Sequence, residues 1–275
     1  MILTRDELPP LLRAIHDPPK RLHLRGEGET EILSRTAVAI VGARMCSTYG
    51  RQVARMLGRE LAASGLVVVS GLARGVDGEA HRGALEAEGH TVAVLGCGID
   101  RSYPVEHARL AQQIADRSLI VSEYGPGIEP LPWRFPARNR IIAGLSLATI
   151  VVEARERSGA LITADFALEE GREVFAVPGD ITSRLSVGTN TLLRLGATPL
   201  TSSLDVLGSL GLEQRERAAP QVGDDAGSLL ERLPATVDEL VHSSGWSAGV
   251  VGAALAELEL AGLAAEDEGV YRALA

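Results

Sequence analysis

Six short β-rich segments, separated by longer segments of helical pattern, limit the folds open to this chain of 275 residues. They are TAVAIVG (36–42), GLVVVSG (65–71), HTVAVLG (90–96), SLIVSE (118–123), ATIVVEA (148–154) and EVFAVPG (173–179). Their continuous apolar character is typical of parallel strands covered on both faces. The intervening segments are long enough for crossover helices, so the sequence predicts an α/β protein with a Rossmann-like, doubly wound, mostly parallel sheet. Such sheets bind ligands at the carboxyl ends of their strands.

Charge is unevenly distributed along the chain. The formal net charge is -9, but residues 205–275 contain 13 acids and 4 arginines, whereas residues 1–204 contain 23 residues of each sign. The acidity therefore belongs to the carboxyl-terminal part, and the neutral part can still form a local anion site. Lys20 is the only lysine, so such a site would consist of arginines, which suit bidentate phosphate contacts. A general preference for arginine codons would explain the same composition.

Changes in composition and hydrophobic pattern along the sequence predict that the chain has four parts. Residues 1–35 form an extension that packs on the core as a helix and an extended segment, 36–210 the Rossmann-like domain, 211–227 an acidic linker, and 228–275 a winged helix. The second helix of a winged helix reads DNA through cationic or amide side chains, yet here it offers only Glu257 and Glu259. We therefore prefer a protein-contact or spacer role for this part over a direct DNA role.

Several common classes of protein are not indicated. No apolar run is long enough to span a membrane, and the amino terminus carries charges and prolines where a signal peptide needs apolar residues, so we expect a cytoplasmic protein. Cys46 and Cys97 lack the number and spacing of a disulfide framework or a zinc site and are expected to be core or loop residues. We expect no metal and no cofactor.

The first strand leads through Gly42 and Arg44 into a loop and then into a helix predicted from about Arg51. Ser47 and Thr48 are helix-capping residue types, and the dipole at a helix N-terminus attracts anions. The junction therefore predicts a phosphate site, with Arg44 as its cationic arm and Ser47 at the helix entry. The alternative is that Arg44 forms an ion pair at the edge of the sheet.

The second strand ends in the glycine-rich segment SGLARGVD, which lacks the spacing of a dinucleotide-binding fingerprint. Gly71 and Gly75 would let a ligand approach the backbone closely, and Arg74 would add positive charge. Asp77 is expected to be an N-cap. Asp77 and His81 together would be a metal or catalytic pair, but two ligands are too few for a metal site, so capping and packing are favoured.

The run WRFPARNR (133–140) places two aromatic residues and three arginines side by side in a chain that is 3% aromatic. Proteins hold single-stranded nucleic acid with aromatic rings, on which bases stack, and with arginines that follow the phosphates. Phe135 is the expected stacking platform. The alternative is a hydrophobic staple, with Pro136 in the first helical turn and Phe135 packed inward. The predicted contacts from this run are Arg134, Phe135, Arg138, Asn139 and Arg140.

A second helix entry follows the fifth strand. Ser158 and Gly159 would present free backbone N–H groups to a phosphate there. Glu153, near the end of the strand, would be either a catalytic carboxylate in an enzyme or a buried acid paired with an arginine.

Seven ordered blocks resemble the DprA/Smf family of DNA-processing proteins and cover nearly all of residues 15–200. They are AIVGARMCSTYG, SGLARGVDGEAH, GCGIDRSYP, SEYGPGIEP, FPARNRIIAGLS, VVEARERSGALITA and GREVFAVPGDITSRLSVGTNTLLRLGA. The resemblance implies a homodimer that binds single-stranded DNA and loads RecA recombinase onto it against single-strand-binding protein during natural transformation. It also implies that Arg44 contacts DNA, that the FPARNR block forms the pocket wall, and that Ser158 and Gly159 line its mouth. The resemblance points to the segment after Gly179 for dimerisation.

The sequence departs from the family pattern at a few places. Because the first predicted strand begins at residue 36, the small helical domain that precedes it in many relatives is not expected here. Ala43 and Ala160 stand where serine is common, which removes two hydroxyl donors and keeps the backbone N–H groups. The carboxyl-terminal part matches the family's winged helix, although its second helix is acidic.

The rival function is an enzyme on a related fold, such as the phosphoribohydrolases that resemble lysine decarboxylases. Those proteins carry a PGGxGTxxE signature, and the equivalent segment here, EARERSGALITA, has neither the paired glycines nor the glutamate. The sequence has no nucleophile elbow and no P-loop lysine either. We therefore predict binding without catalysis.

Overall fold

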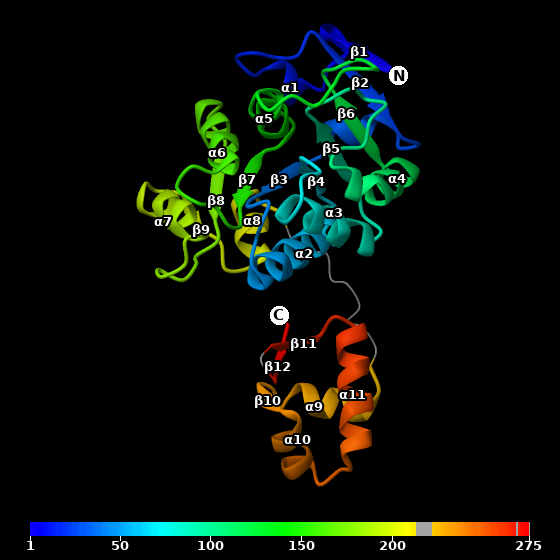
Figure 1. The fold of residues 1–275 in the computed structure, drawn as a ribbon, viewed down its shortest axis with the longest axis vertical. Coiled ribbons are helices and arrows are strands. Elements are labelled where there is room, and N and C mark those ends of the chain that lie inside the picture. Colours follow the sequence, from blue (N-terminus) through cyan, green and yellow to red (C-terminus); the bar gives the residue numbers. More distant parts are fainter. Residues whose placement is uncertain (213–221, 268, 275) are drawn as a thin grey trace. The chain divides into compact units, whose positions relative to one another are not determined.

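A nine-stranded sheet forms the centre of the first of two units in this chain (Figure 1). The computed structural model describes all residues except 213–221, 268 and 275; the first unit is Met1–Arg215 and the second Glu216–Ala275. The strands of this sheet are β1 (Ile2–Thr4), β2 (Arg21–Arg25), β3 (Ala37–Val41), β4 (Val67–Ser70), β5 (Thr91–Leu95), β6 (Leu119–Ser122), β7 (Ala148–Val151), β8 (Glu173–Ala176) and β9 (Thr198–Pro199). The helices of the unit are α1 (Pro10–Arg13), α2 (Thr48–Ala63), α3 (Val76–Glu86), α4 (Ala108–Arg117), α5 (Arg134–Leu145), α6 (Gly159–Glu169), α7 (Val187–Arg194) and α8 (Ser203–Ser209), with 3₁₀ helices at Arg5–Glu7, Thr30–Ser34 and Val105–His107.

The strand order of the sheet is β1-β2-β6-β5-β4-β3-β7-β8-β9. Each of the six predicted segments contains one strand, and these six lie side by side and pair in parallel. From β3 the chain winds outward through β4, β5 and β6, then crosses through α5 to β7 on the other side of β3. The predicted doubly wound sheet is thus confirmed. The order in which the chain adds strands reverses between β3 and β7, and we call this place the switch point.

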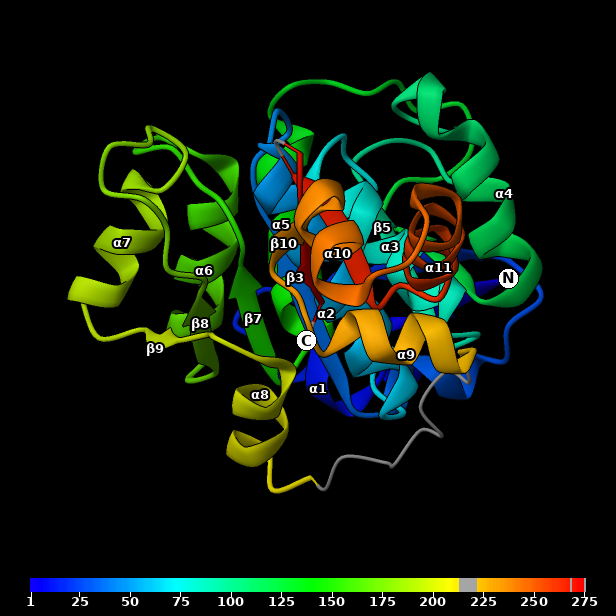
Figure 2. The same ribbon diagram turned by 90° about the horizontal axis from the view of Figure 1, so that it is seen from below.

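Both faces of the sheet are buried, as the apolar segments predicted. Alternate residues of β3 face opposite sides: Ala39 and Val41 pack in the cluster that holds α5 and α6, whereas Val38 and Ile40 pack in the cluster that holds α2, α3 and α8. A third cluster sets α4 against β5 and β6. In both views α6 and α7 lie beside β8 (Figures 1 and 2).

The amino-terminal extension contains the expected helix and extended segment, but it does more than pack on the core. Strand β2 pairs antiparallel with β6, and β1 pairs antiparallel with β2, so both strands belong to the sheet. The open edge of β6 would otherwise leave backbone N–H and C=O groups without partners, and β2 satisfies them. Periodicity did not reveal this, because the two strands are short.

The second unit is a winged helix built around its own core. Its elements are α9 (Asp224–Leu230), β10 (Ala235–Thr236), α10 (Val237–Ser244), α11 (Ala248–Leu260), β11 (Ala264–Asp267) and β12 (Val270–Ala273), with strand order β10-β12-β11. The helix, turn, second helix and hairpin that make up the predicted winged helix are all present. Helix α9 starts inside the range predicted as linker, because Ala226 and Leu229 are buried in this core. The preceding part of that range, 213–221, lies outside the described residues.

Candidate nucleic-acid interface

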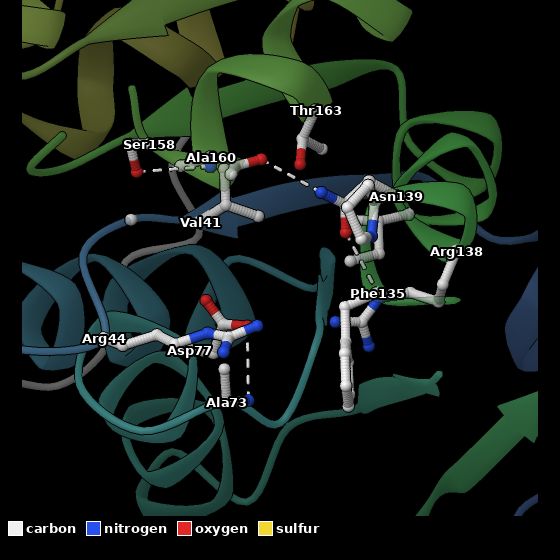
Figure 3. Close-up of a pocket in the computed structure, with 14 residues that line it drawn as sticks. Val41, Arg44, Ala73, Asp77, Phe135, Arg138, Asn139, Ser158, Ala160 and Thr163 are labelled. Atoms are coloured by element: carbon white, nitrogen blue, oxygen red, sulfur yellow. Dashed lines mark hydrogen bonds between the residues drawn. The ribbon is translucent and has the colours of Figure 1, made fainter. Parts of the chain in front are cut away.

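A pocket of about 230 Å³ opens at the switch point of the sheet, at the carboxyl ends of β3 and β7 (Figure 3). Its walls come from the loops after β3 and β4 and from the first turns of α5 and α6. This is the crevice in which open α/β sheets bind ligands. Half of the predicted contact residues line it: Arg44, Phe135, Arg138, Asn139, Ser158 and Gly159.

Arg44 projects into this pocket as an exposed cation. Its guanidinium carbon lies 5.3 Å from the centroid of the Phe135 ring, and Figure 3 shows the side chain extending toward that ring. Across the described residues, Arg44 takes part in none of the ion pairs. The alternative of an ion pair at the sheet edge is therefore wrong within the described chain, and the charge of Arg44 remains available to an anion.

Gly75 fixes the position of the loop that carries Arg44. The backbone of Gly75 has φ +73°, and a Cβ atom there would lie 2.3 Å from the carbonyl oxygen of Ala43 and 2.7 Å from that of Arg44. Glycine is therefore required both for the backbone conformation and for the close approach of the two loops. Gly75 acts on the shape of the pocket but does not line it.

Phe135 forms one wall of the pocket at the start of α5. The ring is half-buried and packs against Tyr103, with centroids 5.2 Å apart and planes tilted by 32°. Because Phe135 lines the pocket, the staple that would bury it is not formed, although Pro136 does lie in the first turn of α5. An open aromatic face beside a free arginine can accept a flat, negatively charged ligand.

Arg138 forms the floor of the pocket and is committed to the protein. Its guanidinium Nη1 donates to the carbonyl oxygens of Gly71, at 2.9 Å, and Val94, while its Nε donates to Asn139 Oδ1 at 3.2 Å. Burial lowers the pKa of Arg138 to about 10, and the nearby carboxylate of Asp77 partly offsets this. The amide of Asn139 also donates to the carbonyl oxygen of Gly159 at 3.0 Å, which ties α5 to α6.

Asp77 is buried beside Arg138 and does not cap the helix as expected. The N-cap of α3 is Gly75, and Asp77 Oδ2 accepts from the backbone N–H groups of Gly71 and Ala73 at 3.1 and 3.3 Å. Burial raises the pKa of Asp77, and the charge of Arg138 opposes this rise. Gly71 carries no side chain because a Cβ atom would lie within 2.6 Å of both the Asp77 and Arg138 side chains. Gly71 therefore supports the floor from outside the pocket.

Three predicted arginines lie outside the pocket lining. Arg74 pairs with Glu106, and Arg140 pairs with Asp17 at 2.9 Å and Glu123 at 2.7 Å. These carboxylates neutralise charges that the sequence suggested were free. Arg134 has a different environment, because its guanidinium carbon lies 5.0 Å from the centroid of the Tyr124 ring and 4.9 Å from that of Trp133.

The N-terminus of α2 is already occupied by a carboxylate of the protein. Ser47 is the N-cap, as expected, and its Oγ accepts from Gly50 N–H at 3.0 Å. The Ser47 backbone N–H donates to Glu153 Oε2 at 2.8 Å, and the Ser47 hydroxyl donates to Glu153 Oε1 at 2.5 Å. A Cβ atom at position 50 would lie 2.4 Å from that carboxylate. The phosphate site expected at Ser47 is thus filled by the Glu153 carboxylate. Glu153 is buried, so it is not accessible to a substrate, and it forms no ion pair with an arginine among the described residues.

The N-terminus of α6 is the open helix entry in this pocket. Ser158 is its N-cap and accepts from Ala160 N–H at 3.3 Å (Figure 3). Gly159 is exposed and lines the pocket. The adjacent Arg155 and Arg157 are exposed as well. We did not predict these two arginines as contacts; the signal was their position directly before a helix-capping serine.

His81 packs below this region as a neutral, fully buried side chain. Thr91 Oγ1 donates to the carbonyl oxygen of Val68 at 2.7 Å, so in its 2.6 Å contact with His81 Nδ1 it acts as the acceptor. His81 Nε2 is buried without a partner among the described residues. Burial lowers the pKa of His81 to about 3. Of the favoured roles of capping and packing, packing therefore holds for His81 and Asp77, whereas Asp77 does not cap α3.

The buried His81 predicts a loss of stability in acid. The ordinary pKa of histidine is about 6.5, so between about pH 6.5 and pH 3 the unfolded chain binds a proton that the native chain excludes. The free energy of unfolding should therefore decrease as the pH is lowered through this window, and His81 should contribute about 1.4 kcal/mol of this decrease per pH unit. Urea denaturation across this range should show a shallower slope for His81→Asn, while the exposed control His16→Asn should match the parent protein. Equal slopes for all three proteins would contradict the assignment.

Cys46 and Cys97 are buried, free thiols, as expected for core residues. Burial raises the pKa of both. Within the residues that the structure describes, His, Cys, Asp and Glu side chains form no cluster of three that could hold a metal ion. No described helix has both the length and the apolar character to cross a membrane.

Known proteins share both units of this chain. Residues 1–211 match the family model of DNA recombination-mediator protein A, and residues 213–269 match that of the DprA winged helix domain. DNA processing protein DprA of Streptococcus pneumoniae is 47% identical over 196 residues, which covers 71% of this chain and 68% of that protein. Its X-ray structure superposes with a TM-score of 0.73 over 79% of this chain and 75% of the other. The structure of DNA processing protein A from Helicobacter pylori, described for its single-stranded DNA binding mode, gives a TM-score of 0.69 at 34% identity, covering 76% of this chain and 95% of the other.

A doubly wound α/β unit with an arginine- and aromatic-lined pocket at its switch point, followed by a winged helix, defines a class of Rossmann-like binding proteins. Family models that together match nearly the whole chain make the assignment specific. The chain belongs to the DprA/Smf family of DNA-processing proteins.

Proposed function

We propose that this protein binds single-stranded DNA in the switch-point pocket without reading its sequence. The observation that carries the proposal is the exposed guanidinium of Arg44 over the half-buried ring of Phe135. Stacking on an aromatic face tolerates every base, and a free arginine recognises the phosphate that all nucleotides share. The Helicobacter pylori relative, described for binding single-stranded DNA, supports this choice of ligand.

The pocket residues divide into contacts and supports. Phe135 stacks on a base, Arg44 binds a phosphate, and the open α6 N-terminus at Ser158 and Gly159 binds a second phosphate. Arg138 and Asn139 shape the floor through hydrogen bonds inside the protein. Base edges are not read by a complementary set of polar groups in this arrangement, so sequence specificity is not expected.

Family membership extends the proposal beyond binding. The matching family is described as a recombination mediator, so we expect the protein to load RecA recombinase onto the bound strand, in competition with single-strand-binding protein, during natural transformation or recombination. A homodimer would bring two pockets to one strand and raise affinity through effective concentration. We expect the winged helix to contact protein, because α11 exposes Glu257 and Glu259 and no cation.

Equilibrium binding with salt titration tests the proposal. Fluorescence anisotropy of labelled single-stranded and duplex oligonucleotides of equal length should show at least about tenfold tighter binding of the single strand, weakening as salt rises. Equal affinity for the duplex would contradict a pocket that uses an unstacked base. A parallel assay for hydrolysis of nucleoside monophosphates tests the rival enzyme, and turnover there would overturn binding without catalysis.

A further inference from the structure

A group of aromatic side chains lies beside the pocket. The chain has two tryptophans, four tyrosines and three phenylalanines. Four of these lie around the start of α5 and the loops after β5 and β6, and we call them the aromatic shelf: Tyr103, Tyr124, Trp133 and Phe135. Trp133 is 60% exposed and Tyr103 is 40% exposed. Exposed aromatic side chains that lie close together are typical of a binding surface.

The shelf is continuous with the pocket. Phe135 belongs to both, and Tyr103 packs directly against it with centroids 5.2 Å apart. Arg134 directly precedes Phe135 in the chain, and its guanidinium carbon lies 4.9 Å from the centroid of the Trp133 ring and 5.0 Å from that of the Tyr124 ring. The surface thus runs from the switch point across the carboxyl ends of β5 and β6.

Among the described residues around the shelf, Arg134 is a cation without an ion pair. Nearby Arg101 pairs with Glu129 at 2.6 Å, and Glu123 pairs with Arg140 at 2.7 Å, so these groups cancel. Arg134 makes no ion pair with a described residue; it donates to the backbone oxygen of Glu129 and lies against two rings. Arg134 therefore repeats the pattern of Arg44, a guanidinium held by an aromatic face with its charge available.

We propose that the aromatic shelf is a second nucleotide-binding region, which receives the strand as it leaves the pocket. Tyr103 stacks on a base next to the one on Phe135, Trp133 stacks on a base further along, and Arg134 binds a phosphate between them. The strand therefore leaves the pocket toward β5 and β6, and not toward β8. This inference rests on the proposed function, because it needs a strand anchored in the pocket.

Binding of oligothymidylates of different length tests the shelf. In anisotropy titrations of the full-length protein with strands of about 4 to about 16 nucleotides, Tyr103→Ala and Trp133→Ala should each weaken binding of the long strands by about tenfold and leave the shortest strands nearly unchanged. Tyr103→Phe keeps the ring and should bind as the parent does. Thermal melting confirms that each variant is folded.

Tyr49→Ala is the matched control for direction. Tyr49 is 48% exposed at the start of α2, and its hydroxyl donates to the carbonyl oxygen of Pro178, after β8. Its loss should leave binding at every length unchanged. Weaker long-strand binding in Tyr49→Ala, with none in the shelf variants, would overturn the proposed direction.

Tryptophan fluorescence separates failure of the shelf from failure of the pocket. Trp246→Phe leaves Trp133 as the sole tryptophan, so its emission reports the shelf directly. Long strands should quench Trp133 and the shortest strands should not. Binding of long strands without quenching would overturn the shelf and leave the pocket standing, whereas absence of binding at any length would overturn the proposed function itself.

Discussion

Replacing Arg44 with alanine is expected to weaken binding of single-stranded DNA by between about tenfold and about 100-fold. Arg44 is exposed, makes no ion pair with a described residue, and lies 5.3 Å from the Phe135 ring. A charge-assisted contact of this kind contributes about 1.5 to 3 kcal/mol, which corresponds to that range. Each lost phosphate contact should also reduce the slope of log affinity against log salt by about 0.7. Anisotropy titrations over a range of salt concentrations measure both quantities.

Arg55→Ala is the matched control. Arg55 is half exposed on α2 but is paired with Glu79 and Glu86, so removing it changes the total charge equally without removing a free cation. Its affinity and salt slope should stay close to those of the parent. If Arg44→Ala and Arg55→Ala behave alike, the pocket does not bind the strand.

Phe135→Ala should weaken binding by about 1 to 3 kcal/mol, and its effect should not add to that of Arg44→Ala. In the proposed complex both side chains contact the same nucleotide, and the guanidinium carbon lies 5.3 Å from the ring centroid, so a double-mutant cycle should give a coupling of at least about 0.5 kcal/mol. Simple additivity would mean that the two side chains act at separate places.

Much of the fold follows from sequence patterns because those patterns are local. The six buried strands are continuous apolar runs, and each lies within the segment that predicted it. Strands β1 and β2 escaped prediction because they are only three and five residues long, and their place in the sheet depends on the distant edge of β6. The alternation of a strand shows which of its faces is buried, but it does not identify the distant strand with which it pairs.

The pocket lies at the sheet edge where the sequence predicted a site, and half of the predicted contact residues line it. Their role in binding stays a prediction. Arg44, Arg74 and Arg140 look alike in sequence, since Arg44 and Arg74 lie in loops directly after strands and Arg140 lies in the arginine-rich run WRFPARNR. What separates them is a carboxylate far along the chain: Glu106 is 32 residues from Arg74, and Asp17 is 123 residues from Arg140. Ser47 was misassigned for the same reason, because Glu153, which occupies its helix entry, is 106 residues away. Only tertiary packing decides which charges remain free.

Replacing Arg138 with methionine is expected to destabilise the first unit by about 3 to 5 kcal/mol. The change removes the larger of the two arginine charges that favour the buried Asp77 carboxylate, the other being Arg44, and it removes the donors to the carbonyl oxygens of Gly71 and Val94. Uncompensated buried charge costs far more than a lost surface pair. Denaturant unfolding of the full-length protein measures the loss.

Two further measurements attribute this loss to Asp77. Asp77→Asn combined with Arg138→Met should be less destabilised than the sum of the single variants, because the amide oxygen still accepts from Gly71 and Ala73 N–H and no buried charge remains. Arg140→Met, which breaks a pair with the exposed Asp17 and the partly exposed Glu123, should cost only about 1 kcal/mol.

The pH dependence of the stability loss in Arg138→Met identifies the cause of that loss. Burial raises the pKa of Asp77, and the charge of Arg138 opposes this rise, so in Arg138→Met the pKa of Asp77 should be higher still. The native state then takes up a proton on Asp77 as the pH falls, at a pH where the unfolded carboxyl is still ionised. The deficit of Arg138→Met relative to the parent should therefore shrink as the pH is lowered and grow as it is raised. A deficit independent of pH would mean that the lost donors to Gly71 and Val94, and not the bared carboxylate, account for it.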